Sequence, residues 1–277
     1  MSQPGGRDLL VLARRVLLDA VEALDRQRDA LILIGAQAVY IHTGSVQIAL
    51  PEATKDSDIA IDREQLADDP LIEQAMAEAG FRMGRDPGSW LGAMDVPVDL
   101  MMPDTMSDPG ATRGARTPPH SKRAIRRAAG LEAAIVDNSP YEITALDHRD
   151  PRRFMMRVAG PAALLIAKMH KLGERNETNV ARLDDKDAHD VYRLLSAVPT
   201  ESLAATLATL RETDLAGTAT ETGLHHFQEL FAVGPDGLGC IMAGRAEELV
   251  GDPQFVSQAA ASLAQDLIRS LASKPPI

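Results

Sequence analysis

The spacing of hydrophobic residues changes several times in the first part of the chain, and each change predicts a different element. Apolar residues recur at helical spacing between residues 8 and 27, with charged residues between them, which predicts an amphipathic helix that lies against a sheet. The apolar run over residues 31–34 then predicts a buried strand that stops at Gly35 and passes into a helix over residues 36–42. The chain is therefore expected to begin as helix, strand, glycine turn and helix.

Residues 56–62 alternate with a period of two and predict a second strand. Alternate side chains of a strand point to opposite faces, so Asp56 and Asp58 share one face while Ile59 and Ile61 share the other. Two carboxylates on one face repel each other and are costly to remove from water, unless a cation or a basic group lies between them. Hard divalent cations with oxygen ligands meet that need, so this strand is the first candidate metal site.

Between this strand and residue 158 the pattern predicts a succession of helix, turns and strands. A helix over residues 63–79 is expected to end at Gly80, and short strands are expected over residues 81–84, 89–94, 96–101, 131–136 and 154–158. Residues 102–117, rich in Pro, Gly, Asp and Thr, are predicted to form a long loop. In the strand over residues 96–101, Val98 and Leu100 face one side and Asp99 the other, which makes Asp99 a third candidate carboxylate.

After residue 158 the chain is predicted to be helical. Pro161 suits the first turn of a helix over residues 161–172, and further helices are expected over residues 184–195, 201–212, 221–232, 238–250 and 254–272. The change in composition at residues 159–161 predicts two domains, residues 1–158 with the sheet and residues 159–277 with helices alone. The predicted fold class is α+β.

Length, charge and cysteine content narrow the function. At 277 residues and a formal net charge of −11, the chain can bury two modest cores, but it lacks the basic surface of a sequence-independent DNA-binding protein. The single Cys240 excludes an intramolecular disulfide, and neither a signal-peptide core nor a membrane span is recognisable, which predicts a cytoplasmic protein that does not engage a membrane. His225 and His226 have no partner at metal-ligand spacing, so a surface or packing role is expected.

A local basic stretch runs against this acidic background. Its members lie between residues 113 and 127 and are Arg113, Arg116, His120, Lys122, Arg123, Arg126 and Arg127. Two interpretations stay open for it, a solvated helix face and a phosphate-binding surface.

The order of strand, glycine turn, helix and Asp-x-Asp strand resembles the nucleotidyltransferase core of the DNA polymerase β superfamily. In that family the Asp pair holds two magnesium ions, so the resemblance implies Mg²⁺ at Asp56 and Asp58, with a nucleoside triphosphate (NTP) as co-substrate. Asp99 would complete the metal site and deprotonate the attacking hydroxyl. The implied fold is a mixed β-sheet with flanking helices, followed by an all-α C-terminal domain.

Two positions compete for the glycine turn that approaches the triphosphate in this family. Gly35-Ala36 occupies the strand-to-helix position but replaces the usual Gly-Ser or Gly-Gly. Gly44-Ser45 has the usual residues and lies closer to the Asp pair along the chain. Gly35 is preferred, and Gly44-Ser45 stays open.

The second half of the chain narrows the resemblance. Lys168 follows an apolar run in one predicted helix, Arg175 and Arg182 come after it, and Asp187 and Asp190 are neighbours on one face of the next helix. This order is similar to that of AbiEii-type nucleotidyltransferases, over residues 31–196. The resemblance implies that Lys168 contacts the nucleotide phosphates and that Asp187 or Asp190 orients this lysine or the acceptor.

Two residues just before the Asp pair bear on nucleotide binding and control. Glu52 stands where many AbiEii-type members have an arginine that contacts a phosphate. In this chain Arg175 or Arg182 would make that contact instead. Thr54 lies on the approach to Asp56, and its simplest role is local hydrogen bonding in the turn. Some resembling toxins are silenced by an antitoxin kinase, and a phosphoryl group on Thr54 would add roughly −1.5 to −2 charges that compete with the triphosphate for the metals.

The leading functional hypothesis is a magnesium-dependent transferase that moves a nucleoside monophosphate from an NTP to an acceptor hydroxyl. The AbiEii-type resemblance implies a toxin of a toxin–antitoxin pair, with transfer RNA as the first acceptor and an antitoxin protein as a partner. A small molecule, such as an antibiotic, is the second acceptor considered. A non-catalytic nucleotide-binding protein of the same fold is the third hypothesis, favoured by the altered glycine motif and by Glu52 but opposed by the three carboxylates.

Overall fold

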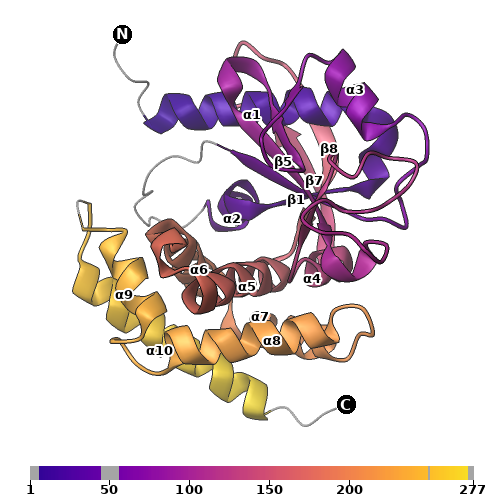
Figure 1. Ribbon diagram of the computed structural model, residues 1–277. Helices are drawn as coiled ribbons and strands as arrows, with labels where there is room; N and C mark the ends of the chain where they lie inside the picture. Colours follow the sequence, from indigo (N-terminus) through magenta and orange to yellow (C-terminus); the bar gives the residue numbers. More distant parts are fainter. Residues whose placement is uncertain (1–5, 45–55, 249, 274–277) are drawn as a thin grey trace. The chain divides into compact units, whose positions relative to one another are not determined.

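The computed structural model describes residues 6–44, 56–248 and 250–273, which form two compact units. The first unit holds residues 6–37, 56–128 and 138–159 and contains a mixed sheet (Figure 1). The second holds residues 38–44, 129–137, 160–248 and 250–273 and is helical. The chain therefore passes between the two units several times.

The sheet of the first unit has the strand order β3-β4-β5-β2-β1-β8-β7, and β6 also pairs with β5. Strands β2 and β5 are parallel, β1 and β2 are antiparallel, and β8 returns from far along the chain to lie parallel to β1. The strands are β1 (Leu31–Ile34), β2 (Ser57–Ile61), β3 (Arg82–Met83), β4 (Ser89–Leu91), β5 (Pro97–Pro103), β6 (Arg126–Ala128), β7 (Asn138–Thr144) and β8 (Arg153–Ala159).

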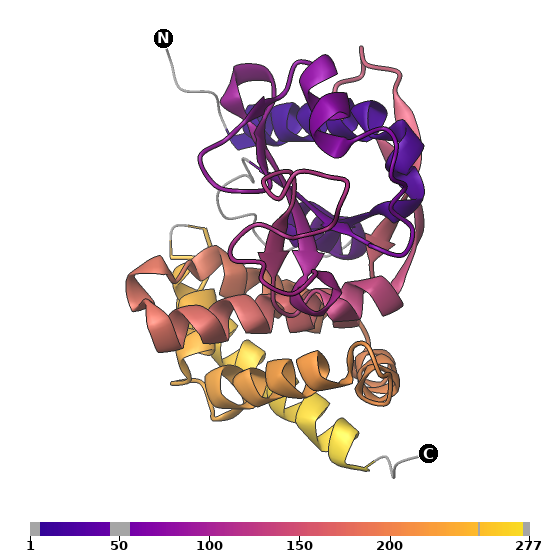
Figure 2. The ribbon, with the colours of Figure 1, turned by 45° about the vertical axis from the view of Figure 1, so that its right-hand side comes forward.

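Helix α1 (Gly6–Ala23) covers one face of this sheet, as the views in Figures 1 and 2 both show. The hydroxyl of Ser57 lies 3.3 Å from the carbonyl oxygen of Ala13 in α1, so Ser57 and the buried Ile59 and Ile61 face the helix. Asp58, between Ser57 and Ile59, points to the opposite face. The apolar stripe of α1 thus fixes which face of β2 carries the carboxylates. Three more elements belong to or begin in this unit, namely η1 (Asp25–Ala30), α2 (Gly35–Thr43) and α3 (Ile72–Glu78).

The second unit is built around α5 (Pro161–Thr178), which begins with proline at its first turn and packs against helices α4, α6, α7 and α8. The long α10 packs against α9, α7 and α6. In the described residues no helix is both long enough and apolar enough to cross a membrane. The helices are α4 (Glu132–Val136), α6 (Asp185–Ala197), α7 (Thr200–Arg211), α8 (Gly217–Phe227), α9 (Leu238–Arg245) and α10 (Pro253–Ser273).

The predicted fold class is confirmed, because a mixed sheet with flanking helices is followed by a helical C-terminal region. Three local predictions are wrong. The strand predicted over residues 131–136 is instead helix α4 (Glu132–Val136), since this short segment contains two adjacent Ala residues. The helix predicted over residues 63–79 begins only at Ile72, because Pro70 cannot continue a helix. The long basic segment forms turns and β6, so the helix-face interpretation is wrong.

Candidate functional site

The site is a row of polar side chains that crosses three strands of the sheet. Asp58 of β2 is directly opposite Asp99 of β5, and Ser89 of β4 is opposite Asp99 on the other side. Residues directly opposite each other in a sheet point to the same face, so these three side chains lie side by side. Asp58 and Asp99 are partly buried, whereas Asp56, two residues earlier on the same face, is exposed.

Gly35 lies against this row because β1 ends opposite Asp58. Its φ of +69° is a conformation that side chains other than glycine rarely adopt, and a Cβ atom on it would lie 2.2 Å from Oδ2 of Asp58. Ala36 follows in the first turn of α2 and is buried. The strand-to-helix glycine turn therefore adjoins Asp58, and its predicted approach to a triphosphate stays a prediction.

The alternative turn cannot be compared in the same way. Gly44 follows the end of α2, where a Cβ atom would lie 3.1 Å from the carbonyl oxygen of Tyr40. Ser45, Glu52 and Thr54 lie outside the described residues, so the predictions made for them stay predictions.

The carboxyl group of Asp99 is subject to opposing influences. Burial raises its pKa above the usual value, while the guanidinium of Arg126 and a hydrogen bond from Ser89 act in the opposite direction, and the negative charge of Asp56 raises it again. Nη2 of Arg126 lies 3.2 Å from Oδ2 of Asp99. Sequence reasoning placed Arg126 in the basic segment but did not connect it with Asp99.

The carboxylates meet the chemical requirement of Mg²⁺, which prefers hard oxygen ligands, and the backbone of Gly35 packs closely against the Asp58 carboxylate. Among the described residues, however, no group of three or more His, Cys, Asp or Glu side chains is arranged to hold a metal ion. The expected convergence of Asp56, Asp58 and Asp99 on one point is therefore not seen. Asp99 instead pairs with Arg126.

A buried polar network lies under the Asp-x-Asp segment, and sequence reasoning did not predict it. Nε of Arg14 in α1 donates to Oε1 of Gln37 at 2.8 Å, and Nε2 of Gln37 donates to the Ser57 hydroxyl at 2.6 Å. Arg14 also donates to the carbonyl oxygen of Thr144 at 2.9 Å. Because Ser57 lies between Asp56 and Asp58, this network fixes the backbone that carries both carboxylates.

The second predicted group, around Lys168, is an ion-pair cluster inside the helical unit. Nζ of Lys168 in α5 lies 2.8 Å from Oδ1 of Asp187 and 2.6 Å from Oδ2 of Asp190, both in α6. Lys171 lies 2.9 Å from Asp187, and Arg175 lies 3.2 Å from it. Burial acts to lower the pKa of Lys168, but the two carboxylates outweigh it and raise that pKa above its usual range.

The cluster bears on the phosphate-binding role predicted for Lys168. Its ammonium group has three donors, and two of them are directed at Asp187 and Asp190. Both carboxylates thus hydrogen-bond to the lysine, and the implied phosphate contact, which stays a prediction, would have to use the remaining donor. The role of Arg182, which is exposed at the end of η4 (Val180–Arg182), stays a prediction, and Arg175 is engaged with Asp187.

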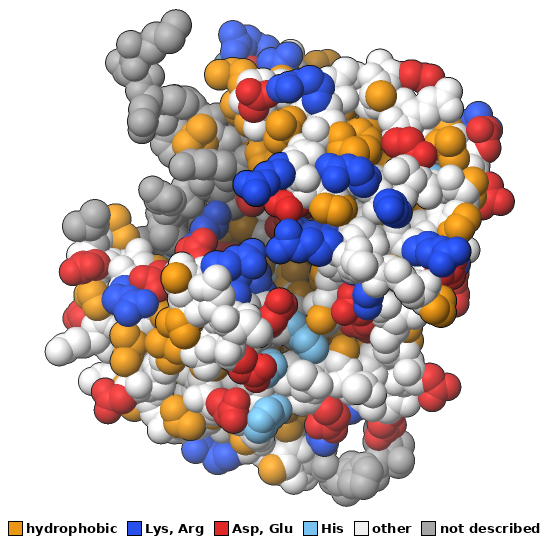
Figure 3. Space-filling view, in the orientation of Figure 1, with side chains coloured by type: hydrophobic (Ala, Val, Ile, Leu, Met, Phe, Trp, Pro, Cys, Tyr) orange, Lys and Arg blue, Asp and Glu red, His pale blue; other side chains and the backbone are white. Residues whose placement is uncertain are grey.

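The basic segment is largely used to hold loops together. The guanidinium of Arg123 donates to the carbonyl oxygens of Gly84 and Arg85, both at 3.0 Å, and Arg127 pairs with Asp104 at 3.2 Å. On the face of the molecule shown in Figure 3, Lys and Arg side chains lie beside Asp and Glu side chains. The phosphate-binding interpretation of the segment is not tested by these contacts.

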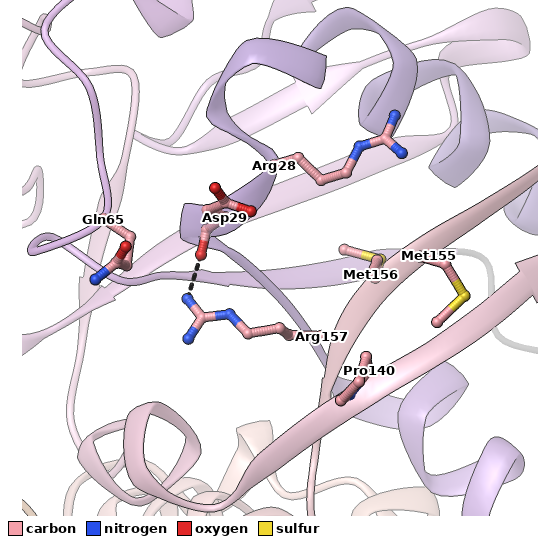
Figure 4. A pocket seen from close by; sticks show the side chains of 7 residues that line it. All are labelled: Arg28, Asp29, Gln65, Pro140, Met155, Met156 and Arg157. Atoms are coloured by element: carbon pink, nitrogen blue, oxygen red, sulfur yellow. Dashed lines mark hydrogen bonds between the residues drawn. The ribbon is translucent and has the colours of Figure 1, made fainter.

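A pocket of about 390 Å³ lies at the other end of β1 from Gly35. Arg157 donates there to the main-chain carbonyl of Asp29 and, at 3.0 Å, to Asp62, while the Arg28 side chain points away from Arg157 (Figure 4). The two guanidinium groups therefore do not converge on one ligand position. The lining residues are Arg28, Asp29, Gln65, Pro140, Met155, Met156 and Arg157.

Comparison with known proteins gives a weak likeness. No protein-family model matches the chain, and no curated protein matches it. Among solved structures, the chain is similar to the solution structure of the antibiotic-resistance factor ANT(2'')-Ia, with 15% sequence identity and a TM-score of 0.38, over 77% of this chain and 97% of that chain. A likeness of this size carries no argument about activity.

Proposed function

We propose that this protein is a magnesium-dependent nucleotidyltransferase that moves a nucleoside monophosphate from an NTP to an acceptor hydroxyl. The observation that supports the proposal is the position of Asp58 directly opposite Asp99, with the backbone of Gly35 packed against the Asp58 carboxylate. Hard oxygen donors beside a tight glycine turn suit a metal ion and the phosphates it accompanies.

In this proposal Asp56, Asp58 and Asp99 would hold the metal, which would bind phosphate oxygens and offset the charge that develops during transfer. The residues of the chain provide the rest. Gly35 lets the backbone approach the phosphates, and Asp99, directly opposite Asp58, is the group placed to accept the proton of the acceptor hydroxyl. The network of Arg14, Gln37 and Ser57 holds the carboxylates in place.

The acceptor proposed first is RNA, transfer RNA in particular, with an antitoxin protein as partner. This finer proposal rests on the AbiEii-type order of Lys168, Asp187 and Asp190 along the chain. A small hydroxylated molecule is the alternative acceptor, and the same assay distinguishes the two.

The test is incorporation of label from each of the four α-labelled NTPs, with Mg²⁺, into total RNA and, in parallel, into a panel of hydroxylated small molecules. Transfer by the wild type should fall by at least about a hundredfold in Asp58→Asn and in Asp99→Asn. Asp104→Asn is the matched control, because Asp104 also forms a 3.2 Å pair with an arginine of β6 but follows β5 rather than facing Asp58. Undiminished transfer in both Asp58→Asn and Asp99→Asn would overturn the proposal.

A further inference from the structure

Arg126 is the residue of this site that has no assigned role. It lies on β6, opposite Met101 of β5, and Met101 and Asp99 are two residues apart on the same strand face. The Arg126 side chain extends back over Met101, with Nη2 2.9 Å from the Met101 sulfur and 3.2 Å from Oδ2 of Asp99. The guanidinium thus lies on the same face of the sheet as Asp58 and Asp99.

The position of Arg126 is fixed by its backbone. Gly88 has a φ of +76°, and a Cβ atom on it would lie 2.3 Å from the carbonyl oxygen of Leu100 and 2.5 Å from the amide nitrogen of Arg126. Gly114 forms a β-bridge with Arg126 from the other side. The backbone of Arg126 is therefore held in position by its neighbours, although its side chain remains 36% exposed.

The contact has an electrostatic consequence for any metal ion. The guanidinium already offsets the negative charge of Asp99, so a divalent cation bound to the same carboxylate would have a third positive charge within a few ångströms. A bare cation is disfavoured by that repulsion. A cation that arrives with a triphosphate is not, because the phosphate oxygens supply acceptors to which the guanidinium can turn.

We infer that Arg126 and the divalent cation compete for Asp99, and that Arg126 transfers to the triphosphate when metal and nucleotide bind together. The inference rests on the proposed function and deepens it. Arg126 makes the site selective for the metal–nucleotide complex over the free metal. A free cation then does not occupy the carboxylates in the absence of NTP.

The test uses the full chain and two glutamine variants. Arg126→Gln and Arg127→Gln each remove one positive charge from β6, and each charge forms a 3.2 Å pair with an aspartate in the wild type. Binding of Mn²⁺ alone is measured by the loss of the free Mn²⁺ signal in electron paramagnetic resonance. Arg126→Gln should bind Mn²⁺ roughly tenfold more tightly than the wild type, whereas Arg127→Gln should differ by less than about threefold.

The second measurement is the affinity for a non-hydrolysable NTP analogue in the presence of saturating Mn²⁺. The expected change in affinity is now in the opposite direction. Arg126→Gln should bind the analogue at least about tenfold more weakly than the wild type, while Arg127→Gln should bind it with an affinity close to that of the wild type. Arg126→Lys, which keeps the charge, should retain the weak binding of Mn²⁺ alone. If Arg126→Gln does not fold, Arg126→Met, which also removes the charge, takes its place in both measurements.

The outcomes separate this inference from the proposed function. If Asp99→Asn and Asp58→Asn abolish Mn²⁺ binding but Arg126→Gln and Arg127→Gln behave alike, the competition is wrong and the metal site stands. If Asp58→Asn and Asp99→Asn bind Mn²⁺ and the analogue as the wild type does, the proposed function itself is wrong. Tighter binding of Mn²⁺ alone together with weaker binding of the analogue, in Arg126→Gln but not in Arg127→Gln, would support both the competition and the proposed function.

Discussion

The carboxylates on the sheet and those of the Lys168 cluster in the helices both lie close together, but they differ in burial and in the number of cationic side chains that contact them. In the helical cluster, Lys168, Lys171 and Arg175 contact Asp187 or Asp190, and both carboxylates are almost inaccessible to solvent. On the sheet, Asp56, Asp58 and Asp99 share one strand face at partial or full exposure, and Arg126 contacts Asp99.

This difference indicates different roles for the two groups. A buried charge that has fixed partners contributes to one folded arrangement and is costly to disturb. Like charges left together near solvent are unfavourable in the free protein and become favourable when a cation binds. The comparison therefore predicts that the helical cluster acts mainly in stability, whereas the sheet carboxylates act in binding if the proposed function is right.

The largest expected effect is on stability, in Lys168→Met. Removing the ammonium leaves Asp190 buried without the partner that binds its Oδ2, so the free energy of unfolding should fall by about 3–5 kcal/mol. Lys171→Met is the matched control, because Lys171 also contacts Asp187 but is 43% exposed, and it should lose less than about 1 kcal/mol. Urea unfolding measures both. A stable Lys168→Met variant that has lost NTP binding would instead favour the phosphate-binding role.

The second effect is the pH dependence of Asp187→Asn. Burial raises the pKa of Asp187, but Lys168 and Lys171 outweigh it and hold this pKa well below its usual range. A depressed pKa in the folded state stabilises the protein above the unfolded pKa of about 3.9, and the stabilisation is lost as the pH falls through the folded pKa.

The difference in unfolding free energy between wild type and Asp187→Asn should thus be about 3 kcal/mol, unchanged from about pH 5 to pH 9, and narrow only below about pH 4. The raised pKa of Lys168 affects stability only at alkaline pH. The stabilisation by its ammonium group begins to be lost as the pH rises past the unfolded pKa of about 10.4. Urea unfolding at a series of pH values measures the difference. Narrowing that begins near pH 6 would show that Asp187 is not held in the ionised form.

The third effect compares two glycines of positive φ. Gly35→Ala and Gly80→Ala each place a side chain in the left-handed region, which should lower the free energy of unfolding by about 1–2 kcal/mol, with a further loss in Gly35→Ala from the collision described next. A Cβ atom on Gly80 would have open space around it, whereas one on Gly35 would collide with the Asp58 carboxylate. Only Gly35→Ala should therefore weaken binding of Mn²⁺ with an NTP analogue, as titration calorimetry would show. Equal loss of binding in both would contradict a site at Gly35.

The smallest effect is expected for Asp58→Asn. Asp58 is only partly buried, and asparagine keeps its size while removing one carboxylate charge, so the free energy of unfolding should change by less than about 1 kcal/mol, even though transfer is lost. Thermal unfolding of the purified variant measures this change. A loss of stability similar to that of Lys168→Met would remove the distinction between the two groups.

The sequence predicted the elements of the sheet site better than their contacts. The alternation of residues 56–62 correctly predicted that the side chains of Asp58 and the buried Ile59 lie on opposite faces of the strand. It contained no information on which strand lies beside β2, because the pairing with Asp99 joins residues far apart in the chain. Arg126 was hidden for a related reason, since β6 is short, polar and without clear periodicity.

In the helical unit the sequence was more informative about neighbours. Asp187 and Asp190 were predicted to share a helix face, and both contact Lys168. What the pattern could not supply was burial, because a Lys-Asp-x-x-Asp helix turn reads the same whether it faces solvent or a core. Strand β7 was missed because it is an edge strand with mostly exposed polar residues.

The pairing of β1 with β8 has a consequence for how the protein folds. Leu33 of β1 is in register with Val158 of β8, so the centre of the sheet joins the start of the chain to a strand made much later. During synthesis on the ribosome, the edge of β1 that pairs with β8 stays unpaired until residues 153–159 have emerged. Such high contact order predicts slow closure of the sheet, and a nascent chain that ends before Arg153 would expose a hydrophobic strand edge prone to aggregation.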